Sequence, residues 1–179
     1  MRRLIAGIAV IMVLALTSCA TPMGSRIAML NRITKTERQR VDERSEQIVD
    51  AINNKDRDAL KSLYSKKALE ESEDFNGGMD MFFDFIEGDI VSWEIVFGVD
   101  TSESVSYGKK TTMYRYDIKI ETDIDSYRVF VIDYYVDTIE PDNEGLYMLQ
   151  IRTSDYKGIL GGWQERMRPG FYIPELVSE

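Results

Sequence analysis

The four residues Leu16-Thr17-Ser18-Cys19 have the types and the order that lipid attachment requires. A thiolate can take a diacylglyceryl group as a thioether, and the small residues before the cysteine are those that a signal peptidase accepts. Cys19 is the only cysteine in the chain, so its acylation would leave no thiol for a disulfide, a metal site or a nucleophile. The pattern predicts a bacterial lipoprotein processing site with Cys19 as the lipidated residue.

The residues before Cys19 are typical of a secretory signal. Arg2 and Arg3 form a positively charged start, and the apolar residues 4–16 are fewer than the roughly 20 that a spanning helix needs. An ordinary secretory signal with an incidental cysteine, or an uncleaved anchor, is the alternative. We expect residues 1–18 to be removed. Cys19, with acyl chains such as palmitate, would then hold the protein at the outer side of the cell membrane.

Four aromatic residues are the candidates for ligand binding. Tyr114, Tyr116 and Tyr134 are expected on the inward face of predicted strands, and Trp93 on a neighbouring strand. Their hydroxyl groups and the indole ring would suit a pocket for a small, partly apolar ligand. The alternative is that the tyrosines are core residues with their hydroxyl groups near the rim.

Catalysis is restricted by composition, because the chain contains no histidine. Histidine is the commonest general base, so any catalysis would depend on carboxylates, tyrosine, lysine or arginine. Strand alternation places Asp133 and Asp137 on the opposite face from Tyr134, unless a β-bulge changes the alternation. We therefore expect no catalytic residue and no cofactor.

The acidic turns at residues 123–125 and 137–145 do not predict a metal site. Neither has the ligand spacing of a calcium loop, and Asp, Asn, Pro and Gly are the usual residues of hairpin turns.

The formal charge of −9 excludes some partners. Loss of Arg2 and Arg3 with residues 1–18 would make it −11. Such a chain is unsuited to nucleic acid, and its net charge opposes electrostatic docking on anionic lipid. The balance fits an extracytoplasmic domain held at the membrane by its lipid alone.

Helical patterns come first and strand patterns follow, which predicts an α+β fold with an antiparallel sheet. Residues 19–35 are a mixture of small, polar and other residues and are expected to form a tether, followed by a domain over residues 36–175 and a tail over 176–179. Helices are predicted from residue 36 to about 53, from Asp56 onward, and over residues 79–86. The predicted strands cover about residues 91–99, 114–121, 127–138 and 147–151, and short turns join consecutive strands.

The predicted helices and strands resemble those of the NTF2-like superfamily. The resemblance is carried by Ala51-Ile52-Asn53-Asn54-Lys55-Asp56 and Leu60-Lys61-Ser62-Leu63-Tyr64-Ser65, followed by long strands. It implies helices packed on the concave face of a bent sheet, a cone that often has a pocket at its open end. Members of that superfamily include enzymes and binding proteins, so the resemblance does not decide between these functions.

A narrower resemblance is to a family of small lipoproteins of Gram-positive bacteria whose domain has no known function. It is carried by Phe82-Phe83 with Gly88, by Asp142-Asn143-Glu144-Gly145-Leu146 and by Gly170-Phe171-Tyr172-Ile173-Pro174-Glu175.

Together these observations predict a membrane-anchored domain that binds a small ligand or an envelope protein without catalysis. One alternative is an enzyme of isomerase or dehydratase type that uses a carboxylate and tyrosines. The other is a protein-interaction module, similar to an immunity protein, with an exposed apolar patch on the outer sheet face around Tyr127, Val129 and Val131. The same face could form a homodimer.

Overall fold

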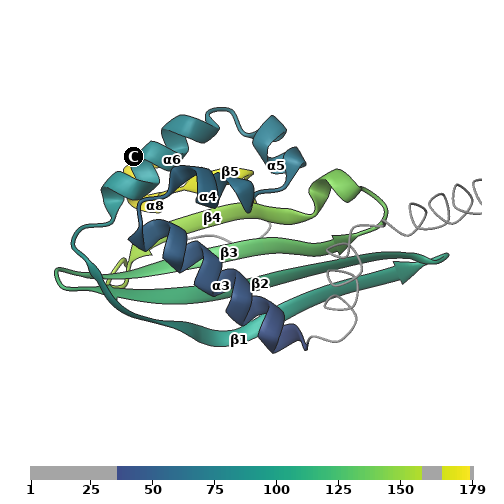
Figure 1. The fold of residues 1–179 in the computed structure, drawn as a ribbon, viewed down its shortest axis with the longest axis horizontal. Helices are drawn as coiled ribbons and strands as arrows, with labels where there is room; N and C mark the ends of the chain where they lie inside the picture. Colours follow the sequence, from purple (N-terminus) through teal and green to yellow (C-terminus); the bar gives the residue numbers. More distant parts are fainter. Residues whose placement is uncertain (1–35, 159–166, 178–179) are drawn as a thin grey trace, which may run out of the picture. The chain divides into compact units, whose positions relative to one another are not determined.

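The structure is a computed structural model that describes residues 36–158 and 167–177. Cys19 and the expected tether therefore lie outside the described residues. The chain divides into two units, Met1–Glu37 and Arg38–Glu179, and the description below concerns the second. Its fold is α+β, with helices packed on a curved and mostly antiparallel sheet, as the sequence predicts (Figure 1).

Four helices precede the sheet, and side-chain caps begin three of them. Asp56 accepts a hydrogen bond from the backbone N of Ala59 at 2.9 Å, and Asp74 accepts one from the N of Gly77 at 2.9 Å. The cap at Asp74 starts the third predicted helix before the glycine pair instead of after it. The helices are α3 (Glu37–Asn53), α4 (Arg57–Ser62), α5 (Lys66–Glu71) and α6 (Phe75–Phe85).

The sheet has five strands in the order β1-β2-β3-β4-β5. The first four form an antiparallel meander, as predicted, whereas β5 pairs parallel to β4 and was not predicted. The strands are β1 (Ile90–Ser106), β2 (Lys109–Thr122), β3 (Ser126–Asp137), β4 (Gly145–Thr153) and β5 (Gly170–Tyr172). Two short helices, η1 (Pro141–Asn143) and α8 (Pro174–Val177), complete the described part.

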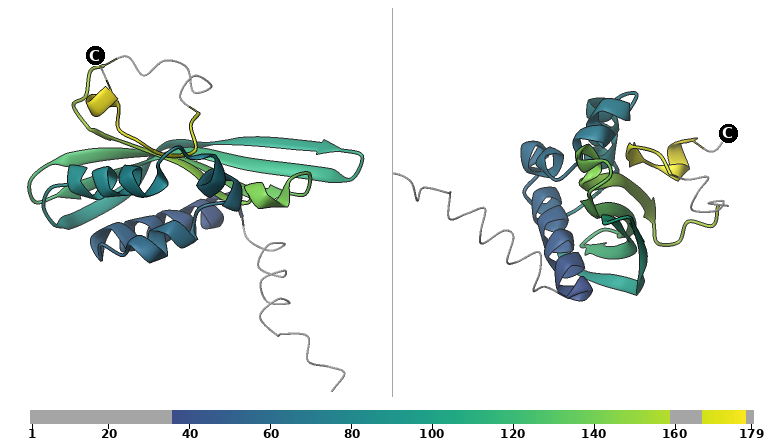
Figure 2. Two further views of the ribbon diagram at one scale, coloured as in Figure 1. Left: turned by 90° about the horizontal axis from the view of Figure 1, so that it is seen from above. Right: turned by 90° about the vertical axis from the view of Figure 1, so that its right-hand side faces the viewer.

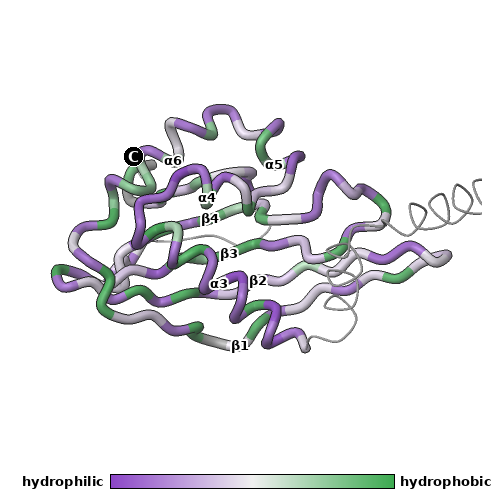
Figure 3. The backbone as a smooth tube through the Cα atoms, viewed as in Figure 1, coloured by the Kyte–Doolittle hydropathy of each residue, from purple (hydrophilic) through white to green (hydrophobic). Residues whose placement is uncertain are grey.

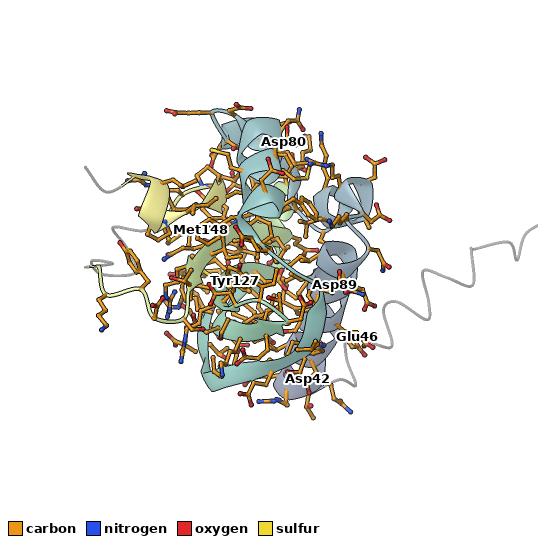
Figure 4. All side chains as sticks on the ribbon, turned by 90° about the vertical axis from the view of Figure 1, so that its left-hand side faces the viewer. Asp42, Glu46, Asp80, Asp89, Tyr127 and Met148 are labelled. Carbon is orange, nitrogen blue, oxygen red and sulfur yellow. The ribbon has the colours of Figure 1, made fainter. Side chains whose placement is uncertain are left out.

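The main core lies between the helices and one face of the sheet. Along α3 a hydrophobic residue recurs about every turn among hydrophilic ones, and the predicted stripe is buried (Figure 3). Figure 4 places Asp42 and Glu46 at the margin of the molecule, on the side of α3 away from this core. The stripe consists of Val41, Ser45, Ile48, Val49 and Ile52.

The apolar patch expected on the outer sheet face is not there. Tyr127, Val129 and Val131 are at most 2% exposed and belong to the core on the helix side. The prediction was wrong because β3 is apolar on both faces, and the outer face instead carries Phe130 and Ile132. These two residues pack in a second, smaller cluster with Met113 and Met148.

Among the described residues, no helix is both long and apolar enough to cross a membrane.

Candidate functional site

Tyr114 and Tyr116 lie beneath α3, on the helix side of β2. They are 1% and 2% exposed, and both belong to the main core. Arg40 of α3 donates a hydrogen bond from Nη1 to the Tyr114 hydroxyl at 3.2 Å. Both tyrosines are therefore packing residues that a ligand could reach only if α3 moved.

Tyr134 lies on the opposite face of the sheet from these two tyrosines. It pairs in register with Met113 and packs against Tyr147, with ring centroids 5.9 Å apart. The expectation that Tyr114, Tyr116 and Tyr134 share one face is therefore wrong. A register shift between Thr112 and Met113 accompanies this pairing, and such a shift is not visible in a single sequence.

Asp133 is the polar residue that the sequence interpretation placed on the wrong side. It pairs in register with Tyr114 and faces α3, where Arg44 Nε lies 3.0 Å from its Oδ2. The side chain of Asp133 is 3% exposed and that of Arg44 is 22% exposed. Burial raises the pKa of Asp133, and the neighbouring guanidinium of Arg44 opposes that rise.

Three further buried polar atoms lie close to this ion pair, and two of them are hydroxyl groups that interact with each other. They are the Ser45 Oγ, the Tyr116 hydroxyl and the Asp133 Oδ1. Burial, with the nearby charge of Asp133, raises the pKa of Tyr116, so its phenol stays protonated and can only act as a donor or neutral acceptor. We call Arg44, Ser45, Tyr116 and Asp133 the Asp133 cluster. A phenol beside a carboxylate of raised pKa is an acid–base pair, but this one is covered by α3.

Trp93 lies at the open side of the sheet. It is 36% exposed and stands on β1, the strand that has only β2 as a partner in the described sheet. A groove of about 200 Å³ runs between α3 and this strand. We call it the Trp93 groove; its lining consists of Val49, Asp50, Asn53, Ile90, Val91, Ser92 and Trp93.

A second hollow, of about 300 Å³, adjoins Trp93 on the strand surface and is lined also by Glu94, Lys119 and Glu121. The indole thus stands at the rim of both hollows. An exposed tryptophan beside an unpaired strand edge is suited to binding an extended peptide.

The acidic turn after β3 is held by Asp137 in a structural role. Asp137 Oδ1 accepts hydrogen bonds from the backbone N of Ile139 and of Glu140, each at 3.0 Å. Its Oδ2 accepts one from Asn143 Nδ2 at 3.1 Å, and Thr111 Oγ1 donates to Oδ1 at 3.2 Å. Within residues 36–158 and 167–177, no group of three or more potential ligands could hold a metal ion.

Comparison with known proteins identifies the family of this chain. No curated protein matches the chain. A family model described as "Domain of unknown function (DUF5104)" matches residues 47–157, which begin within α3 and end four residues after β4. This match covers more than half of the 179 residues, and the chain therefore belongs to the DUF5104 family.

Proposed function

We propose that the protein is a lipoprotein anchored outside the cell membrane through Cys19, and that its domain acts by binding. The support for the anchor is the sequence Leu16-Thr17-Ser18-Cys19 at the end of a short apolar run. The helix-covered curved sheet is the arrangement that the NTF2-like resemblance implies, and the resemblance to small Gram-positive lipoproteins supports the anchor.

The Trp93 groove is the proposed binding surface, and the exposure of Trp93 is the observation that carries this proposal. Tyr114 and Tyr116 are buried under α3, whereas the indole of Trp93 reaches solvent beside the free edge of β1. An extended segment of an envelope protein could add to that edge as a strand and pack against the indole. A small ligand inside the cone is the weaker form of the proposal, because the tyrosines expected to line it are packed.

Crosslinking in the producing bacterium tests this surface. A photoreactive amino acid replaces Trp93 in the full chain, and the matched control places it at Met81, which is 52% exposed on α6. We expect an adduct of one defined mass from position 93 and none from position 81. The same adducts from both positions, or none from either, would contradict the proposal.

An enzyme of isomerase or dehydratase type is the second candidate, because Asp133 faces the same side as Tyr116. A carboxylate of raised pKa next to a protonated phenol is the pair that such chemistry would use. For a substrate to reach it, α3 would have to open while the rest of the fold stays intact.

Hydrogen exchange separates the two candidates without knowledge of a substrate. If the Asp133 cluster is catalytic, the amides of α3 exchange through a local opening, faster than those of β3. If the domain acts by binding, we expect the amides in the buried turns of α3 to exchange only through global unfolding, at the same rate as those of β3.

A further inference from the structure

The tip of the β1–β2 hairpin carries an unusual turn residue. Ser106 and Lys109 are joined by Tyr107 and Gly108, whose φ angles are 50° and 76°. Two consecutive positive φ angles define a hairpin turn that strongly favours Asn-Gly, because a bulky side chain is strained in this conformation. Tyr107 is therefore expected to destabilise the turn relative to asparagine.

Among residues 36–158 and 167–177, the Tyr107 side chain makes no packing contact that compensates for this cost. The Tyr107 side chain is fully exposed, and Val105 is 64% exposed two residues before it. Gly108 has no neighbour within 4 Å of the position that a Cβ would take, so the turn stands free of the rest of the described chain. We call residues 105–110 the hairpin tip. Its apolar surface is largely exposed.

The charge of the hairpin tip is opposite to that of the protein. Lys109 and Lys110 are adjacent in a chain whose formal charge is −9. Lys110 pairs with Glu103 at 2.7 Å, whereas Lys109 makes no ion pair with any residue that the structure describes. An anionic surface would repel most of this protein but would accept the hairpin tip.

The hairpin tip also lies at the end of the sheet where the chain enters the domain. Arg40, in the first turn of α3, contacts Tyr114 of β2. From Tyr114 toward the hairpin tip, β1 and β2 extend beyond the end of β3 (Figure 2). The turn at Ile124, at the other end of β2, lies far from this point. If residues 19–35 form the expected tether, its root-mean-square length is about 23 Å.

We propose that the hairpin tip is a second membrane contact, in which Tyr107 and Val105 enter the interface of an anionic bilayer and Lys109 meets the lipid phosphates. Tyrosine suits this position because its ring is apolar and its hydroxyl is polar. The proposal rests on anchoring through Cys19, which raises the effective concentration so that a weak contact suffices. The contact orients the domain relative to the membrane.

A fluorescent label in the acylated full chain tests the contact. Because Cys19 is the only cysteine and would be acylated, Val105→Cys supplies a single labelling site and keeps Tyr107. The labelled protein is reconstituted in vesicles of phosphatidylglycerol and phosphatidylcholine that contain a quencher-bearing lipid. The matched control is Ile124→Cys, which is also at a 64% exposed position in a hairpin turn.

We expect quenching at position 105 to exceed that at position 124 by about threefold or more, and to fall in vesicles of phosphatidylcholine alone. Adding Tyr107→Asn to the labelled variant should reduce the quenching by about half without harming the fold, because Asn-Gly is the favoured turn pair. Equal quenching at positions 105 and 124 in membrane-bound protein would overturn the hairpin contact and leave the anchor intact. Recovery of both variants in the soluble fraction would overturn the anchor, and with it this contact.

Discussion

Arg44 of α3 and Asp133 of β3 form an ion pair, with 3.0 Å between Nε and Oδ2, that joins the first helix of the domain to the middle strand of the sheet. The carboxylate is almost completely buried and its second oxygen has no partner in the described residues. Removing the arginine would leave a charge in a place that water does not reach.

Arg44→Met should therefore lower the free energy of unfolding by about 3 kcal/mol at pH 7. The loss should shrink as the pH is lowered, because the isolated Asp133, whose pKa burial already raises, takes up a proton and becomes neutral. Urea denaturation of the variant and the parent protein at pH 7 and pH 5 measures both effects.

Arg38→Met is the matched control, since Arg38 pairs with Asp42 on the exposed side of the same helix. It should cost less than about 0.5 kcal/mol. If Arg44→Met is as mild as Arg38→Met at pH 7, Asp133 is not a buried charge that needs its partner.

Asp137→Asn should cost about 1–3 kcal/mol at neutral pH, because the new amide nitrogen would face the Nδ2 donor of Asn143 and the charge on the acceptor is lost. Burial raises the pKa of Asp137, but the hydrogen bonds that it accepts outweigh this effect and hold the pKa below its ordinary value. The donors are Glu140, Asn143, Ile139 and Thr111. Their contribution is complete above the unfolded pKa and is lost as the pH falls through the lower folded pKa.

The difference in stability between the parent and Asp137→Asn should therefore be constant from neutral pH down to about pH 4 and should narrow below it. Chemical denaturation across this pH range checks the sign. Asp142→Asn, at an exposed position in the same turn, should show little effect at any pH. A difference that widens on acidification would show that the folded pKa of Asp137 is raised instead.

Local signals in the sequence predicted the order of helices and strands well. Asp56 is a typical N-cap residue and correctly indicates the start of α4. The alternation of apolar and polar residues in β2 correctly indicates a half-buried strand. The third helix, predicted over residues 79–86, begins at Phe75, so the glycine pair Gly77-Gly78 lies inside α6; Asp74 caps the helix before the pair. Gly78 is also where α6 approaches β5, since an added Cβ would lie 3.3 Å from the Phe171 Cβ.

The candidate site was harder to predict because β3 is apolar on both faces. Alternation correctly separates Tyr134 from Asp133, but it does not say which of the two faces the helices. The expectation that Tyr134 faces the helices therefore placed the carboxylate of Asp133 on the outer face of the sheet, whereas it is buried on the helix side. The parallel strand β5 consists of three residues that are distant in sequence from β4. No local sequence pattern predicts so short a strand or its pairing with β4.

Gly145→Ala should be strongly destabilising, by about 3 kcal/mol or more. Gly145 has a φ of 127°, and an added Cβ would lie 2.8 Å from the backbone N of Ser65 and 2.9 Å from the O of Leu63. Both neighbours are backbone atoms that bond to Leu146, so they cannot move aside. Thermal denaturation measures the loss, and Gly98→Ala, at a position with nothing within 4 Å, should be nearly neutral. Equal losses for both variants would contradict the close approach of β4 to the residues between α4 and α5.

Tyr107→Asn should stabilise the protein by about 0.5–1 kcal/mol, because it replaces a strained residue by one that the turn favours and removes no contact. Tyr107→Val should do the reverse, since a β-branched residue tolerates a positive φ poorly. Denaturation in the absence of membranes measures both. If Tyr107→Asn is destabilising, the tyrosine contributes to folding and is not reserved for an external contact.

The anchor at Cys19 is the central claim, and the intact mass of the protein extracted from the membrane of the producing bacterium tests it most directly. We predict a chain that begins at Cys19, with residues 1–18 removed and the mass of a diacylglyceryl group added. Cys19→Ser should leave an unprocessed precursor without this added mass. An unmodified chain of 179 residues, or a chain cleaved elsewhere with a free Cys19 thiol, would contradict the account.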